Sequence, residues 1–174
     1  MGKTNVGKTD DHTTKPEIGE TTWGPMSITL ARRTNPKKET KRLGEMAEAA
    51  FLSKATTLGF GVSKPWGDSE RYDFIVDVKS RIFRVQVKSA HSVSKCSGGG
   101  YHIDGGRTRY RDSYTPDEID MLVAYIVPED VWYIFPPSAF GTMGGINIFT
   151  QGKRTTKYEP YREAWHIFSE RVPV

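Results

Sequence analysis

Three polar residues that could act together in catalysis lie on two consecutive strand-like segments. Asp73 lies near the start of YDFIVDV, and Gln86 and Lys88 lie in the next segment, RIFRVQVKSA. Asp73 can bind a hard cation such as Mg²⁺ through oxygen, and the Gln86 side-chain carbonyl and the Val87 main-chain carbonyl can add to it. Lys88 can orient or deprotonate a water, or neutralise charge that develops on phosphate. The spacing therefore indicates a metal-dependent phosphodiesterase arrangement.

A β-hairpin is the element that must hold these residues together. Phe83, Val85 and Val87 alternate with polar residues along 81 to 90, as expected of a strand with one face in the core. The segment 72 to 78 reads as its partner, and Lys79-Ser80 predicts a tight turn between the two. The opposite face, which carries Arg84, Gln86 and Lys88, is predicted to line a cleft.

A long helix is predicted before the hairpin, over residues 37 to 58. Asn35-Pro36 is a favourable start, and Gly59 supplies a left-handed cap. Six apolar residues recur at helical spacing: Leu43, Met46, Ala47, Ala50, Phe51 and Leu58. Glu48 lies about 120° from the centre of this stripe and Glu45 about 180° from it, so Glu48 is nearer the sheet. A solvated helix face is the alternative for Glu48.

The remaining elements complete an α/β domain with a mixed central sheet of about five strands. Three further strands are predicted at 60 to 66, 121 to 127 and 131 to 135, a helical turn from Thr115, and a C-terminal helix at 160 to 170 with Tyr161, Trp165 and Phe168 on one side. The glycine-rich segment 96 to 106 reads as a mobile loop. Asp120 is expected to cap or to pair with a base rather than to bind metal.

Three ordered motifs resemble the PD-(D/E)XK nuclease superfamily, most closely the branch that contains homing endonucleases and related bacterial endonucleases. They are Gly44 to Glu48 on the helix, Tyr72-Asp73-Phe74, and Arg84 to Lys88. The segments 119 to 125 and 132 to 136 are similar to the distal strands of that branch, so the resemblance covers about residues 38 to 140. It implies a restriction-endonuclease-like core, with the helix followed by a mixed sheet and flanking helices.

The resemblance also implies a role for each matching residue. Asp73 is a metal ligand, Gln86 stands in place of the commoner acid, Lys88 is the catalytic lysine, and Glu48 is the helix carboxylate and a third ligand. The implied activity is that of a Mg²⁺-dependent endonuclease on DNA, with Mn²⁺ as a substitute metal. Two departures are the missing proline before Asp73 and the neutral amide of Gln86, which binds Mg²⁺ more weakly than a carboxylate. The alternatives are a nuclease of the Holliday-junction-resolvase kind and a catalytically silent DNA-binding module.

Positive charge is concentrated near the predicted cleft. Residues 79 to 111 hold eight Lys or Arg and a single acid, although the whole chain carries a net charge of only +4. DNA contacts are predicted from five residues: Arg84, Arg107, Arg109, Tyr110 and Arg111. A flexible basic loop is the alternative for the last four.

Composition restricts the other classes of protein. The chain has 174 residues, one cysteine (Cys96) and no apolar run near the ~20 residues that span a bilayer. We therefore expect an intracellular, cytoplasmic protein without membrane contact. A homo-oligomer, either a dimer or a tetramer, is a separate expectation. Gly2 to Thr9 matches a phosphate-binding loop, but no strand precedes it and a polar segment follows, so the match is attributed to chance.

Residues 1 to 34 are predicted to be a disordered polar tail, and 35 to 174 the endonuclease-like domain. The tail lacks apolar periodicity, so it has no surface to bury against a core. A truncated chain that starts at Asn35 is expected to keep the thermal midpoint of the full chain in a melting experiment. A large drop in that midpoint would show that the tail packs on the domain.

Overall fold

The computed structural model describes residues 1, 36–67, 69–94, 98–106, 113–140, 145–150 and 157–169. The chain divides into two units, Met1–Arg33 and Thr34–Val174, and every element described below belongs to the second. The predicted tail beyond Met1, including the Gly2 to Thr9 motif, lies outside the described residues. Within the described part of the chain, no helix has both the length and the apolar character needed to cross a membrane.

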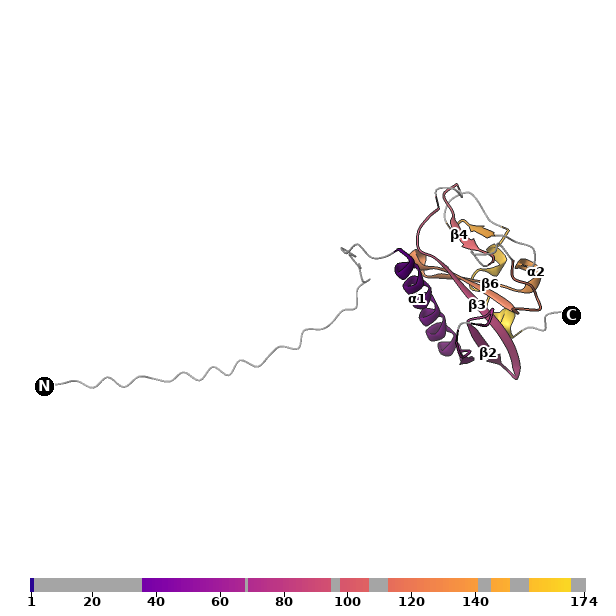
Figure 1. Cartoon of the computed structure of the whole chain (residues 1–174), viewed down its shortest axis with the longest axis horizontal. Coiled ribbons are helices and arrows are strands. Elements are labelled where there is room, and N and C mark those ends of the chain that lie inside the picture. The colour runs from indigo at the N-terminus through magenta and orange to yellow at the C-terminus, as the bar shows by residue number, and fades with distance from the viewer. Residues whose placement is uncertain are drawn as a thin grey trace. The chain divides into compact units, whose positions relative to one another are not determined.

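A mixed five-stranded sheet forms the centre of the domain (Figure 1). Its strands, in spatial order, are β1 (Gly61–Ser63), β2 (Phe74–Val78), β3 (Arg81–Ala90), β5 (Met121–Ile126) and β6 (Val131–Phe135). The pair β3 and β5 is parallel and the other neighbouring pairs are antiparallel. The structure confirms the predicted α/β class and the mixed sheet of about five strands.

Helix α1 (Pro36–Thr57) covers one face of this sheet. Its buried residues are Ala47, Phe51 and Ala55, which repeat every four positions and pack with the apolar face of β2 and β3. Met46 and Leu58, which the predicted stripe included, are 43% and 42% exposed, because the contact with the sheet follows a narrower seam. Gly59 has φ +82° and ends the helix as predicted.

A second apolar core lies on the other face of the sheet, under a small sheet that the sequence did not predict. Strands β4 (Tyr101–Asp104) and β7 (Gly145–Ile148) pair antiparallel and bury Ile103 and Ile146. The predicted mobile loop at 96 to 106 is therefore wrong for its second half. Gly100 allows the close approach, since a Cβ there would lie 2.8 Å from the Ile148 carbonyl oxygen.

The predicted C-terminal helix at 160 to 170 is replaced by two 3-10 turns, η3 (Glu159–Tyr161) and η4 (Trp165–Phe168). Glu163, between them, has φ +47°, which breaks the helical repeat. The Glu163 carboxylate accepts hydrogen bonds from Trp132 N and Trp165 Nε1, each at 2.8 Å. Trp165 and Phe168 consequently pack in the α1-side core, whereas Tyr161 packs on the opposite core.

Two short helices complete the described elements. The 3-10 helix η2 (Val127–Glu129) forms the turn between β5 and β6, and α2 (Pro137–Phe140) follows β6. A single turn begins at Thr115, as predicted: the Thr115 carbonyl accepts from Ile119 N at 3.1 Å, and the Thr115 N–H donates to the Glu118 carboxylate at 3.0 Å.

Candidate active site

The β2–β3 hairpin places Asp73 beside Gln86. The turn residues Lys79 and Ser80 have φ of 52° and 65°, a conformation that joins two strands with a two-residue turn. Phe74 then pairs with Val85, and Asp73 N donates to Val85 O at 2.9 Å. The predicted hairpin is confirmed, and its register is what brings the two polar residues together.

Hydrogen bonds connect Asp73 to two consecutive residues of β3. Asp73 Oδ2 accepts from Gln86 Nε2 at 2.5 Å and from Val87 N at 2.8 Å. Gln86 Nε2 also donates to the Val87 carbonyl oxygen at 3.1 Å, and the Gln86 side chain is buried. The amide nitrogen thus lies between two oxygens, one anionic and one a carbonyl, that a cation could share.

The environment of Asp73 makes its negative charge costly. Burial raises the pKa of Asp73 from 3.8 to about 6, and the negative charge of Glu48 adds to the rise. The Val87 N–H and the positive charges of Lys88 and Lys64 oppose it. A desolvated carboxyl with both negative and positive side chains around it is typical of functional sites.

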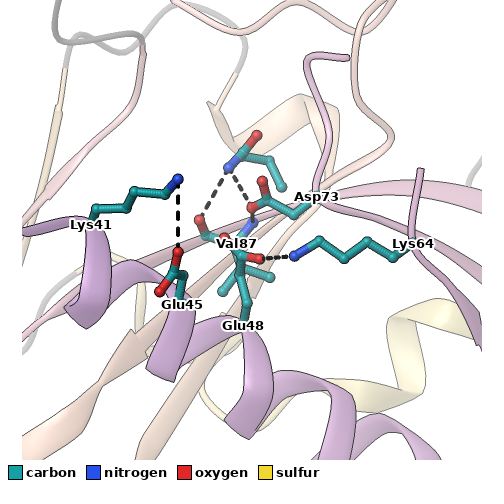
Figure 2. A network of polar contacts seen from close by, with 7 residues as sticks. Lys41, Glu45, Glu48, Lys64, Asp73 and Val87 are labelled. Atoms are coloured by element: carbon teal, nitrogen blue, oxygen red, sulfur yellow. Dashed lines mark hydrogen bonds and ion pairs between the residues drawn. The ribbon is translucent and has the colours of Figure 1, made fainter. Parts of the chain in front are cut away.

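Glu48 is the helix carboxylate that the structure brings to this cluster. Its Oε2 lies 2.5 Å from Lys64 Nζ, and Figure 2 shows the two side chains pointing toward one another close to Val87 and Asp73. Glu45 instead pairs with Lys41 at 3.9 Å, where both side chains are well exposed. The geometry therefore favours Glu48 over Glu45 as the helix residue of the site.

A cavity of about 850 Å³ opens between the first half of α1 and residues 64 to 73. Both carboxylates of the site line it, together with three lysines: Lys37, Lys41 and Lys64. The carboxylates could bind a cation there, and the lysines could contact a polyanion. Sequence reasoning missed Lys64. In the structure β1 runs antiparallel to β2, so the residue after Ser63 lies near the start of β2.

Lys88 lies on the same side of β3 as Gln86 and is half-buried. Its Nζ lies 5.3 Å from the centroid of the Tyr114 ring, a cation–π distance. Because the charge of Lys88 lowers the pKa of Asp73, the ammonium is within electrostatic reach of the carboxylate. The four predicted site residues, Glu48, Asp73, Gln86 and Lys88, are therefore neighbours in space.

Arg84, whose predicted DNA contact stays a prediction, is held by protein groups. Its guanidinium donates to both Asp120 carboxylate oxygens, Nη2 to Oδ1 at 2.9 Å and Nε to Oδ2 at 3.0 Å, and its backbone N donates to Oδ2 at 2.7 Å. Further donors reach the carbonyls of Pro116 and Asp117. Burial opposes ionisation of Asp120, but these bonds hold the pKa of that carboxyl below its ordinary value. Asp120 pairs with a base, as expected.

Replacing Arg84 is expected to affect stability rather than DNA affinity. Arg84→Met removes the guanidinium donors to the Asp120 carboxylate and to two carbonyls but keeps the backbone N–H donor to Asp120. The loss is expected to lower the free energy of unfolding by about 1 to 3 kcal/mol. Denaturant melts and metal-free DNA titrations measure the two effects separately. A normal melt with weakened DNA binding would instead support the predicted DNA contact. Arg107, Arg109, Tyr110 and Arg111 lie outside the described residues, so their predicted contacts remain predictions.

The oxygen donors at the site fit a hard divalent cation. Among the described residues no group of three or more His, Cys, Asp or Glu is placed to hold a metal, so the set has two carboxylates, Glu48 and Asp73, and two neutral oxygens. The Val87 carbonyl is already directed at the cluster. Rotation of the terminal amide of Gln86 exchanges its nitrogen for its oxygen at the same place. Oxygen ligands of this kind are those preferred by Mg²⁺.

A mixed sheet is covered on one face by a long helix, and an acid, an amide and a lysine meet at the β2–β3 hairpin. The model of a family described as PD-(D/E)XK endonuclease matches residues 38–168. The chain belongs to the PD-(D/E)XK endonuclease family, a class of DNA-cleaving hydrolases, which confirms the resemblance identified in the sequence.

A solved structure is similar to this chain over most of both molecules. It is described as the structure of a bacterial homing endonuclease, I-Ssp6803I, and is 34% identical, with a TM-score of 0.66. The similarity covers 74% of this chain and 91% of that chain. The comparison with curated proteins gave no match.

Proposed function

We propose that this chain is a homing-endonuclease-like enzyme that hydrolyses DNA phosphodiester bonds with Mg²⁺ at the cavity between α1 and β2. The observation that carries the proposal is the cluster in which Asp73 Oδ2, Gln86 Nε2 and the Val87 carbonyl meet, with Glu48 close by. Family membership and the similarity to a homing endonuclease support the same reading.

The chain's own oxygens would hold the cation. Asp73 and Glu48 would supply the charged ligands, and the Val87 carbonyl and the rotated Gln86 amide the neutral ones. When bound, the metal supplies Lewis acidity toward phosphate and water, and Mn²⁺ has the same preference for oxygen. Burial of Asp73 excludes competing water from its carboxylate and strengthens each electrostatic contact there.

Lys88 would act on the other reactants. Its ammonium lies within reach of Asp73, so it can orient the attacking water or stabilise negative charge on the phosphate oxygens. Tyr114 beneath the ammonium restricts its position without removing its charge. The attacking water's proton would pass to solvent as its oxygen bonds to phosphorus, and the 3′ oxygen would leave as its own bond to phosphorus breaks, taking a proton from solvent.

A duplex has two strands, and one chain presents one such cluster among its described residues. Cleavage of both strands in one binding event therefore requires two copies, which supports a homo-oligomer, a dimer or a tetramer. We propose the intracellular, cytoplasmic location on the composition of the chain.

Gln86→Glu tests the proposed ligand set. The variant replaces the amide that donates to Asp73 with a second carboxylate at a 2.5 Å contact, so the metal-free protein is expected to melt at a lower temperature. Mg²⁺ is expected to raise its thermal midpoint more than that of the parent, and to saturate at a lower concentration. Melting curves against Mg²⁺ concentration measure this without any reaction, and plasmid cleavage on the same samples measures the effect on rate.

Arg84→Met serves as the matched control, since it changes the same strand but none of the proposed ligands. Its Mg²⁺-induced shift is expected to equal that of the parent. An equal shift in Gln86→Glu and the parent would show that residue 86 does not contact the metal.

A further inference from the structure

Lys64 contacts a carboxylate of the proposed site from an element that no motif includes. Its Nζ lies 2.5 Å from Glu48 Oε2 and 5.7 Å from the centroid of the Phe74 ring. The edge strand β1 determines this position, because Ser63 pairs with Ile75 and the next residue is therefore carried to the start of β2. Lys64 thus stands between the helix and the strand that supply the two acids.

The Glu48 carboxylate needs a partner to stay at the cavity. A glutamate on a helix surface has three rotatable bonds, and its charge gains most by turning toward water. The Glu48 side chain is nevertheless only 24% exposed, with Lys64 as its contact on the cavity wall. The two acids also repel one another, and the positive charge of Lys64 acts on both.

We propose that Lys64 is a positioning residue for the cleavage reaction, whose ammonium holds the Glu48 carboxylate in the cavity beside Asp73. The inference rests on the proposed function, in which both acids act in cleavage. It also gives β1 a second role besides forming the edge of the sheet. The strand positions Lys64, the residue that follows it, so that the Lys64 ammonium holds the Glu48 carboxylate in place.

A double-mutant cycle on single-turnover cleavage tests whether Lys64 acts through Glu48. Lys64→Met is expected to reduce the rate by about 10- to 100-fold, the usual effect of losing the partner of a ligand. Glu48→Gln removes the charge that Lys64 orders, so the double variant is expected to be no slower than Glu48→Gln alone. Lys64→Arg keeps the charge and is expected to restore most of the rate.

Lys54→Met is the matched control for loss of a half-exposed lysine that pairs with a glutamate. Lys54 lies on α1, 3.6 Å from Glu163, away from the cavity. The control is expected to cut at the parental rate. The NMR signal of the Glu48 side-chain carboxyl carbon, recorded on metal-free protein, is expected to shift in Lys64→Met and not in Lys54→Met, and it decides the case if Glu48→Gln has no measurable rate.

Four results would overturn the inference. The first three are parental cleavage by Lys64→Met, a double variant slower than Glu48→Gln by the full factor of Lys64→Met, and an unshifted Glu48 signal. A rate loss explained by weaker metal-free DNA binding would also overturn it, and would make Lys64 a phosphate contact. Asp73→Ala in the same series distinguishes failure of the inference about Lys64 from failure of the proposed function. If Asp73→Ala is inactive, only the inference has failed, whereas full activity of Asp73→Ala means that the proposed function has failed.

Discussion

Asp73→Asn is expected to abolish DNA cleavage while leaving the domain at least as stable as the parent. The asparagine oxygen can accept the same hydrogen bonds from Gln86 Nε2 and Val87 N, but it carries no charge for a cation. The parent places a carboxylate where burial raises its pKa to about 6. A rise from 3.8 corresponds to a cost of up to about 3 kcal/mol at neutral pH, which the variant avoids.

The pH dependence of this cost has a definite sign. The folded Asp73 keeps its proton up to about pH 6, whereas the unfolded carboxyl releases it near 3.8. The folded state therefore binds more protons between these values, and this group lowers the free energy of unfolding as pH rises through that window. Denaturant melts of the metal-free parent and Asp73→Asn from pH 4 to 8 measure the effect. The difference between their free energies of unfolding is expected to grow as pH rises, with the variant the more stable of the two at pH 8.

Cleavage by the parent is expected to fall as pH drops through about 6, because protonation removes the charge of a proposed ligand. Sustained cleavage by Asp73→Asn at the parental rate would contradict the role given to this carboxylate. Loss of the cooperative unfolding transition in Asp73→Asn would show instead that the negative charge of Asp73 is needed to stabilise the β2–β3 hairpin.

Substitutions on the two faces of β3 are expected to fail in different ways. Lys88→Ala removes a cation beside Asp73 and is expected to reduce turnover by about 100- to 10,000-fold with little change in melting. Val87→Ala truncates a side chain in the α1-side core and is expected to cost about one to a few kcal/mol. Its main-chain N–H and carbonyl remain, so the folded fraction is expected to cleave normally.

Melting curves and single-turnover rates on both variants separate the effects. If Lys88→Ala cuts at the parental rate, Lys88 has no part in the proposed reaction. If Val87→Ala melts like the parent, the assignment of the two faces is reversed.

Local pattern and register made the centre of the site predictable from sequence. A period of two over 81 to 90 assigns Gln86 and Lys88 to one face, and a two-residue turn fixes which residue lies opposite Gln86. The helical periodicity favoured Glu48 over Glu45. The predicted apolar stripe also included Met46 and Leu58, which are exposed in the structure. These features depend on neighbours within about 20 positions in the chain.

The features that were missed depend on contacts between distant segments. Strand β4 forms because residues 145 to 148 pair with it, and its glycine-rich approach reads locally as a loop. The C-terminal turns follow from the hydrogen bonds of Glu163 to Trp132 on the edge strand β6, which no periodicity encodes. Lys64 was missed because the edge strand is three residues long and its partner is on the helix.

Conversion of supercoiled plasmid to nicked and linear forms by the full chain tests the central claim most directly. With Mg²⁺, the parent is expected to cleave and Asp73→Asn to leave the plasmid intact; in excess chelator, neither is expected to cleave. Cleavage that persists in chelator, or that Asp73→Asn performs as fast as the parent, would contradict a metal-dependent site built on Asp73.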